Sequence, residues 1–180
     1  MTDRRCIQTY SGVMFDVFDP KPEDVRIEDI AHHLANLCRY TGACRFHFSV
    51  AQHSYYVSQY CDPEDALYGL LHDASEAYLN DVASPLKHTP EFKFYRNLEL
   101  GVQKAILQAL GLPYSYRESV KAADENVYHT ERTQLMLYNA EWNSRYPDAK
   151  PLPFFITEWT QAVAKDNFLS RFYYLRTHKK

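Results

Sequence analysis

The sequence has few glycines and no long apolar run. It contains only five glycines among 180 residues, and no apolar stretch approaches the ~20 residues that a membrane-spanning helix needs. The absence of such a stretch argues against a membrane protein. Thinly spread glycines and several long amphipathic segments instead favour a mostly helical fold. No repeat, low-complexity stretch or linker divides the chain.

Neither the cysteines nor the net charge points to a special environment. None of the four cysteines forms a CxxC pair, and no signal peptide precedes them. We therefore expect reduced thiols in a cytoplasmic protein. The formal net charge of −3 gives no sign of binding to a nucleic-acid polymer. An anionic substrate must then be attracted locally, by a metal ion or a few basic residues.

Length and composition fit one compact domain over residues 1–180, because 46% of the residues are hydrophobic. The N-terminal segment 7–17, with Ser11-Gly12 at its centre, predicts a small β-hairpin. Apolar spacing and end signals then predict about six helices. They are expected at about residues 28–38, from 50 onward, 62–80, 89–111, 117–138 and 156–176, with a loop at 81–87.

Ser49 and Gln52 have the spacing of a capping box, which predicts that a helix begins near residue 50. His53 then lies in the first turn or just beyond it. The next helix is expected to begin at Asp62-Pro63, because an N-cap residue followed by proline is a strong start signal.

The adjacent residues His72 and Asp73 are the most informative feature of the chain, because they interrupt an otherwise apolar helical segment. Burying such a pair without a partner is costly. A divalent metal ion compensates well, because histidine nitrogen and aspartate oxygen are both common ligands. Glu76 follows one helical turn after His72 on the same face, where a carboxylate could transfer protons for a metal-activated group.

Other predicted helices offer further candidate ligands, His53 and Asp124. Two histidines and two aspartates on a helical bundle suit a hard or borderline divalent ion, with open positions for water and substrate. The residues alone leave a second interpretation open. In it, His53 and His72 are hydrogen-bonded core histidines and Asp124 is a charge on a helix surface.

A series of motifs along the chain matches one known family. The motifs are Asp29-Ile-Ala-His-His-Leu34, Cys38-Arg-Tyr-Thr-Gly42, Phe48-Ser-Val-Ala-Gln-His-Ser54, Leu70-Leu-His-Asp-Ala-Ser-Glu-Ala-Tyr78, Asp81-Val-Ala-Ser-Pro-Leu-Lys87 and Lys121-Ala-Ala-Asp124. Together they resemble the HD-domain phosphohydrolases, in particular bacterial 5′-deoxynucleotidases and small phage and prophage proteins that include dATP triphosphohydrolases. The resemblance implies an all-α HD-domain bundle with a small N-terminal hairpin. It also implies a homo-oligomer in the cytoplasm of a bacterial or phage-infected cell, with neither a nucleic-acid polymer nor a membrane as partner.

The resemblance further implies a metal centre. It assigns His53, His72, Asp73 and Asp124 as ligands of a divalent ion, with Glu125 as the nearest rival of Asp124. The ion can be Co²⁺, Mn²⁺, Zn²⁺ or Mg²⁺, since mixed nitrogen and oxygen ligands suit all of them.

Five more residues receive roles from the resemblance. Glu76 matches the acid that acts on the water or the leaving group, and Arg39 and Tyr40 fall where the nucleotidases carry Arg-Trp beside sugar and phosphate. Asp81 matches an acid that contacts the sugar hydroxyl, and Lys87 matches a base that reaches phosphates in the triphosphohydrolases. Each also has a plain interpretation, as a solvated, capping or packing residue.

We therefore expect metal-dependent hydrolysis of deoxynucleotide phosphoesters. The leading expectation is that a deoxynucleoside triphosphate such as dATP yields deoxynucleoside and triphosphate. The alternative is a 5′-deoxynucleotidase that releases phosphate from monophosphates. Two alternatives belong to other classes of protein. One is a di-iron HD oxygenase, for which only His88 offers an extra ligand. The other is a non-catalytic nucleotide-binding module, which would not need both a set of metal ligands and Glu76.

Overall fold

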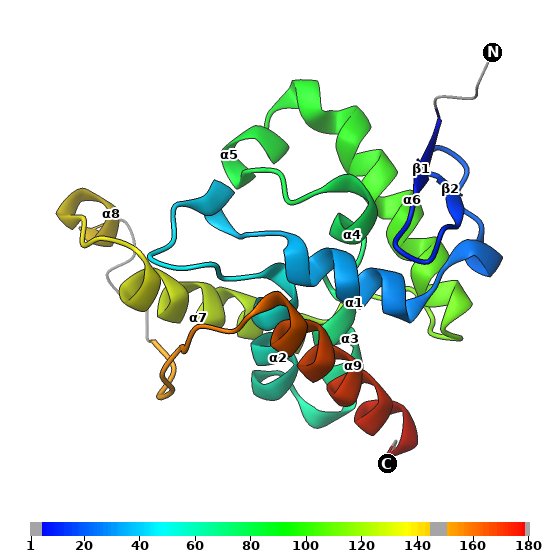
Figure 1. Ribbon diagram of the computed structural model, residues 1–180. Coiled ribbons are helices and arrows are strands. Elements are labelled where there is room, and N and C mark those ends of the chain that lie inside the picture. Colours follow the sequence, from blue (N-terminus) through cyan, green and yellow to red (C-terminus); the bar gives the residue numbers. More distant parts are fainter. Residues whose placement is uncertain (1–4, 145–150, 179–180) are drawn as a thin grey trace.

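The computed structural model describes residues 5–144 and 151–178, and Figure 1 shows their arrangement. The strands are β1 (Cys6–Gln8) and β2 (Met14–Asp16), and the helices are α1 (Ile27–Asn36), α2 (Val50–Tyr60), α3 (Ala66–Leu71), α4 (Glu76–Leu79), α5 (Ser84–Lys87), α6 (Lys93–Ala109), α7 (Glu118–Leu135), α8 (Ala140–Ser144) and α9 (Gln161–Thr177). The prediction of a mostly helical fold with a small N-terminal hairpin is confirmed. Within the described ranges, no helix is both long and apolar enough to cross a membrane.

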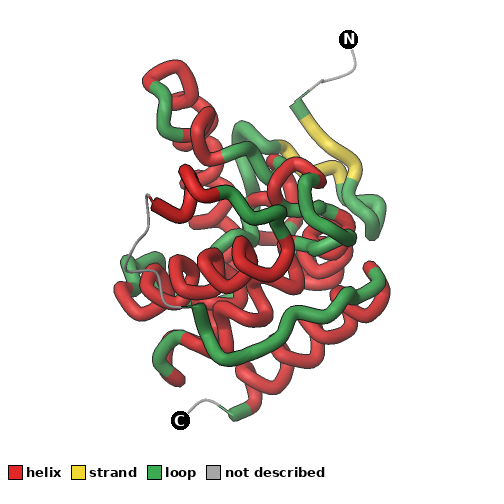
Figure 2. The backbone as a smooth tube through the Cα atoms, turned by 90° about the vertical axis from the view of Figure 1, so that its left-hand side faces the viewer, coloured by secondary structure: helices red, strands yellow, loops and turns green. Residues whose placement is uncertain are grey.

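The hairpin lies at the edge of the helical body (Figure 2). Its strands are antiparallel, with Ile7 opposite Phe15. Gly12 has a φ of +88° in the connecting turn, a conformation that favours glycine. The turn is fixed to α1, because the backbone N–H of Ser11 donates to Asp29 Oδ1 over 2.7 Å. This anchor joins the hairpin to the helices.

Helix α2 is the centre of the fold and contacts α1, α3, α7 and α9. It begins at Val50, where Ser49 Oγ accepts a hydrogen bond from the backbone N–H of Gln52 over 3.1 Å. The predicted start is therefore confirmed. The side chain of Gln52, however, donates to the carbonyl of Thr157 over 2.8 Å. His53, also in the first turn, is fully buried.

The prediction of one helix over residues 62–80 is wrong, because the chain turns between α3 and α4. Gln103 of α6 explains the interruption. Its amide donates to the carbonyl of Leu71 over 2.7 Å and accepts from the backbone N–H of Ser75 over 3.1 Å. Those two backbone groups would bond to each other in a continuous α-helix. Glu76 therefore begins a new helix instead of extending the first.

Three other boundaries differ from expectation. The short helix α5 occupies part of the segment expected to be a loop, with Pro85 in its first turn. Helix α7 ends at Leu135 and helix α9 begins only at Gln161. Thr160 caps α9 by accepting from the backbone N–H of Val163. The extended segment before α9 packs on α2 and α7 through residues such as Phe154 and Ile156.

Candidate metal centre

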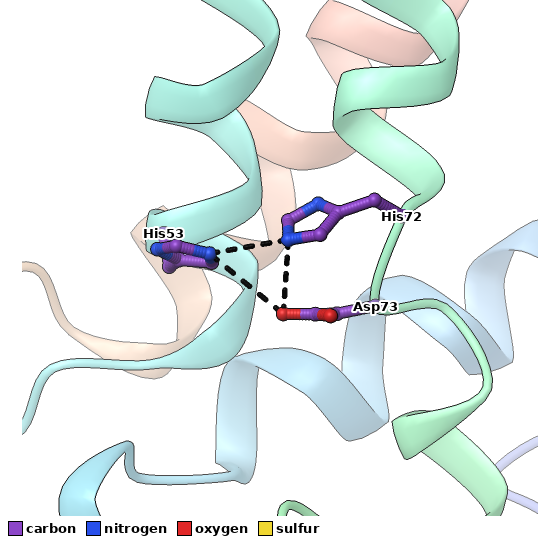
Figure 3. A group of neighbouring side chains, drawn as sticks. All are labelled: His53, His72 and Asp73. Atoms are coloured by element: carbon purple, nitrogen blue, oxygen red, sulfur yellow. Dashed lines mark hydrogen bonds and ion pairs between the residues drawn. The ribbon is translucent and has the colours of Figure 1, made fainter. Parts of the chain in front are cut away.

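The chain brings together four of the residues expected to bind metal. His53, His72 and Asp73 each place one ligand atom within 4.8 Å of the others (Figure 3). The two Nε2 atoms are 3.2 Å apart, and Asp73 Oδ2 lies 3.1 Å from Nε2 of His72. Asp124 Oδ1 of α7 lies 3.1 Å from Nε2 of His53. Its sequence neighbour Glu125 is exposed.

A close approach of α3 to α2 allows the two histidines to meet. A Cβ atom at Gly69 would lie 2.8 Å from Sγ of Cys61 and 3.1 Å from Cα of Ser58. A side chain at this position would require Sγ of Cys61 to shift and the backbone of Ser58 to move by a few tenths of an ångström. Gly69 also contributes its carbonyl, which lies 2.8 Å from Nδ1 of His72. Gly69 therefore allows α3 to lie close to α2, and its carbonyl orients His72.

The hydrogen bonds leave both Nε2 atoms suited to a cation. Nδ1 of His72 faces the carbonyl of Gly69, and Nδ1 of His53 lies 2.6 Å from Oε1 of Glu131. Both partners accept, so each Nδ1 carries a proton, and a ring that gives up its second proton to bind a cation has its lone pair on Nε2. These two nitrogens and one oxygen of Asp73 lie within 4.8 Å of one another, and an oxygen of Asp124 lies 3.1 Å and 3.8 Å from the two nitrogens. That donor set fits a divalent metal ion.

Charge in this cluster also favours a cation. Burial alone would lower the pKa of His72, but Asp73 outweighs it and raises the pKa to about 9. Burial would likewise raise the pKa of Asp73, yet His72, His53 and Arg39 hold it far below its usual range. The cluster therefore gains stability from positive charge, which either protons or a metal ion can supply.

Glu131 is a site residue that the sequence interpretation did not identify. It is fully buried and accepts from Nδ1 of His53, from Nε of Arg39 over 3.1 Å and from the hydroxyl of Tyr40 over 2.7 Å. Burial would raise its pKa, but Arg39 and His53 lower it below the usual value. The available signal was its position two helical turns after Asp124, on the same face of α7.

Arg39 and Tyr40 lie beside the cluster on the side of Glu131. Nη1 of Arg39 is 3.7 Å from Oδ2 of Asp73. Tyr40 and Thr41 have φ values of +56° and +51°, which are unfavourable for residues other than glycine. The bond from the Tyr40 hydroxyl to Glu131 helps to hold this turn. We call Arg39, Tyr40, His53 and Glu131 the closed half of the site.

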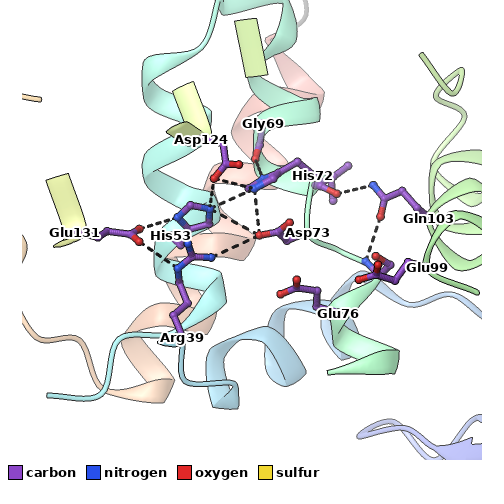
Figure 4. A network of polar contacts seen from close by, with 12 residues as sticks. Arg39, His53, Gly69, His72, Asp73, Glu76, Glu99, Gln103, Asp124 and Glu131 are labelled. Atoms are coloured by element: carbon purple, nitrogen blue, oxygen red, sulfur yellow. Dashed lines mark hydrogen bonds and ion pairs between the residues drawn. The ribbon is translucent and has the colours of Figure 1, made fainter. Parts of the chain in front are cut away.

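A cavity of about 320 Å³ opens on the other side of His72 and Asp73. Its wall includes one more carboxylate from α4, one lysine from α5 and two polar residues from α6. We call these residues the open half of the site: Glu76, Lys87, Glu99 and Gln103. In Figure 4, His72 and Asp73 lie in the middle. Glu131 and Arg39 lie on one side of them, and Glu99 and Gln103 lie on the other side.

Glu76 has one oxygen without a partner. Oε1 accepts from Nζ of Lys87 over 2.8 Å, whereas Oε2 is buried and has no hydrogen-bond partner among the described residues. Burial, Asp73 and Asp81 raise the pKa of Glu76 to about 8. The side chain can therefore hold or release a proton near neutral pH. Asp81 acts on it through charge and itself lies just after α4.

Lys87 is not a free cation. Its Nζ lies 2.8 Å from Oε1 of Glu76 and 2.9 Å from Oε1 of Glu99. Burial lowers its pKa, but the two carboxylates outweigh burial and hold it above its usual range. The residue expected to reach phosphates is thus already paired with two acids of the open half.

Comparison with known proteins shows bacterial relatives. The chain is 39% identical over 132 residues to the uncharacterized protein YfdR of Escherichia coli strain K12, covering 73% of this chain and 72% of YfdR. It belongs to the YfdR family. A second relative, the uncharacterized protein RCAP_rcc00048 of Rhodobacter capsulatus, is 34% identical over 138 residues, covering 69% of this chain and 70% of the relative. No protein-family model matches the chain, and neither name states what a YfdR-family protein does.

Proposed function

We propose that this YfdR-family protein is an HD-domain metal-dependent phosphohydrolase of deoxynucleotides. One observation carries the proposal: ligand atoms of His53, His72 and Asp73 lie within 4.8 Å of one another beside a cavity, with Asp124 3.1 Å from His53. His53, His72, Asp73 and Asp124 would hold a divalent ion there. Such an ion lowers the pKa of a water molecule to near neutrality and offsets charge on phosphoryl oxygens.

The surrounding residues suit the remaining steps of phosphoester hydrolysis. Glu76 projects a buried, unpartnered oxygen and has a pKa raised to about 8, so it can take a proton from water or give one to the leaving oxygen. Arg39 brings positive charge within 3.7 Å of Asp73. A guanidinium in that place offsets the negative charge of a bound phosphate.

Two substrates fit this chemistry. The resemblance favours a deoxynucleoside triphosphate such as dATP, cleaved to deoxynucleoside and triphosphate, with Lys87 binding the phosphates. The pairing of Lys87 with Glu76 and Glu99 favours the second candidate, a monophosphate that is cleaved to deoxynucleoside and phosphate. A monophosphate carries less charge and does not require Lys87 to leave its partners.

Product analysis tests the proposal. The protein is incubated with the common deoxynucleoside mono- and triphosphates and with Co²⁺, Mn²⁺, Zn²⁺ or Mg²⁺, beside a chelated control. We expect deoxynucleoside with either phosphate or triphosphate, and no product in the chelated sample. Absence of both products with every metal would contradict the proposal. Oxygen consumption with iron would then indicate an oxygenase, and nucleotide binding that survives chelation would indicate a binding module.

A further inference from the structure

The open half contains a residue that the proposed reaction does not use: Glu99, the second acid bound to Lys87. Nζ of Lys87 lies 2.8 Å from Glu76 and 2.9 Å from Glu99. Both acids are more than three-quarters buried, with side-chain exposures of 6% and 19%. Ion pairs shielded from water in this way are screened less by solvent and salt than surface pairs.

The position of Lys87 is also fixed through its backbone. Arg96 of α6 donates through Nη1 to the carbonyl of Lys87 and to the carbonyl of Thr89. Glu99 follows Arg96 by about one turn of the same helix. Helix α6 therefore holds Lys87 at two places, its backbone through Arg96 and its ammonium through Glu99.

The lysine of the cavity wall is not open to an anion without competition. Apart from the candidate metal ligands His72 and Asp73, the wall carries the two acids Glu76 and Glu99 and the lysine Lys87, which both acids contact. A ligand with several phosphates must compete with Glu99 for Lys87 and must also approach the carboxylate of Glu99. A ligand with one phosphate at the metal centre meets neither obstacle.

We propose that Glu99 is a specificity-determining residue that disfavours polyphosphates relative to monophosphates by occupying Lys87. The inference rests on the proposed function for the identity of the substrate. The inference does not depend on which nucleotide the protein prefers, because Glu99 is expected to change the activity on triphosphates relative to the activity on monophosphates.

The test compares Glu99→Gln with the wild type through the ratio of kcat/KM for dATP to kcat/KM for dAMP. We expect this ratio to rise about tenfold, which corresponds to about 1.4 kcal/mol. Glu91→Gln is the matched control, because it removes the same charge from an exposed residue just before α6; its ratio should equal that of the wild type. Adding Lys87→Met to Glu99→Gln should cancel the gain, since the released ammonium is then missing.

A second measurement separates this inference from the proposed function. Calorimetry measures the affinity of inorganic tripolyphosphate for the metal-loaded wild type, for Glu99→Gln and for Glu99→Ala. Tighter binding of tripolyphosphate to both variants supports the role of Glu99, even if no nucleotide is hydrolysed. Absence of hydrolysis would overturn only the proposed reaction. A different result overturns the role of Glu99 alone. In that result the wild type hydrolyses nucleotides, but the variants keep the wild-type ratio of kcat/KM for dATP to dAMP and the wild-type affinity for tripolyphosphate.

Discussion

The two halves of the site are both rich in charge, but they differ in how completely that charge is satisfied. In the closed half, Glu131 alone accepts hydrogen bonds from His53, Arg39 and Tyr40. In the open half, an oxygen of Glu76 beside a cavity is buried and has no partner within residues 5–144 and 151–178. A buried polar atom without a partner costs free energy that a fully bonded one does not.

This difference assigns separate tasks to the two halves. A fully bonded network fixes His53 in one tautomer and one orientation, which a metal ligand needs. An unsatisfied carboxylate next to open space retains the capacity to exchange a proton, which a fully bonded carboxylate lacks. The closed half therefore positions the ligands and holds Arg39 beside them, and the open half leaves room for the substrate.

The largest expected effect comes from removing a ligand that lies between the halves. His72→Ala should abolish tight metal binding and lower activity by on the order of 10³-fold, because the charge stabilisation supplied by the ion is worth several kcal/mol. His88→Ala, which changes an exposed histidine, serves as the control. Metal titration by calorimetry and the rate of product release measure both effects. Equal metal affinity in the His72→Ala protein would show that the cluster is not a metal centre.

Glu76→Gln tests the open half. We expect activity to fall by about 10²- to 10⁴-fold while metal affinity changes little, because a positioned acid or base contributes about that much to a rate. Steady-state kinetics and metal titration on the same sample measure the two quantities. An undiminished rate would remove Glu76 from the reaction.

The same substitution makes a prediction about pH. Without metal, Glu76 has a folded pKa of about 8 against an ordinary value of 4.5. Its contribution to stability is then fully present below the ordinary value and is lost as pH rises through about 8. Urea unfolding of the chelated proteins should show wild-type stability falling, relative to Glu76→Gln, across this window. Parallel pH profiles would mean that the carboxyl is not perturbed.

Glu131→Gln tests the closed half and should have the smallest effect on catalysis. We expect metal affinity to fall by about 10- to 100-fold, because Glu131 orients a ligand without touching the ion. The free energy of unfolding should fall by about 3 kcal/mol, because Arg39 loses a buried charged partner. Glu131→Gln should thus weaken metal binding and stability, whereas Glu76→Gln should lower the rate with little change in metal affinity. A Glu131→Gln protein as stable as the wild type would show that the closed half is not a structural support.

Local sequence signals correctly predicted those structural elements that are determined by residues close together in the sequence. The hairpin and the start of α2 follow from Gly12 and Ser49, whose effects reach only a few residues. Residue types on separate segments suggested the four candidate ligands, and motif resemblance assigned them. The structure groups His53, His72 and Asp73 and places Asp124 3.1 Å from His53. His53 and Asp124 lie in α2 and α7, which were expected as helices, whereas His72 and Asp73 lie in the turn between α3 and α4.

Features that depend on distant residues were not predicted. The interruption between α3 and α4 requires Gln103, which approaches from another helix and bonds to Leu71 and Ser75. Glu131 was marked only by its position two helical turns after Asp124, because all three of its partners lie far away in the sequence. The pairing of Lys87 with Glu99 is likewise visible only once α5 and α6 are packed together.

The bonds of Glu131 have a consequence for the order of folding. They join α7 to residues 78 to 92 positions earlier in the chain, and contacts at such separations close large loops and form slowly. The histidine that Glu131 orients is therefore not ready to bind an ion until α7 has docked. A pulse of metal added during refolding should be captured only in the last phase, so that ion uptake reports the completion of folding.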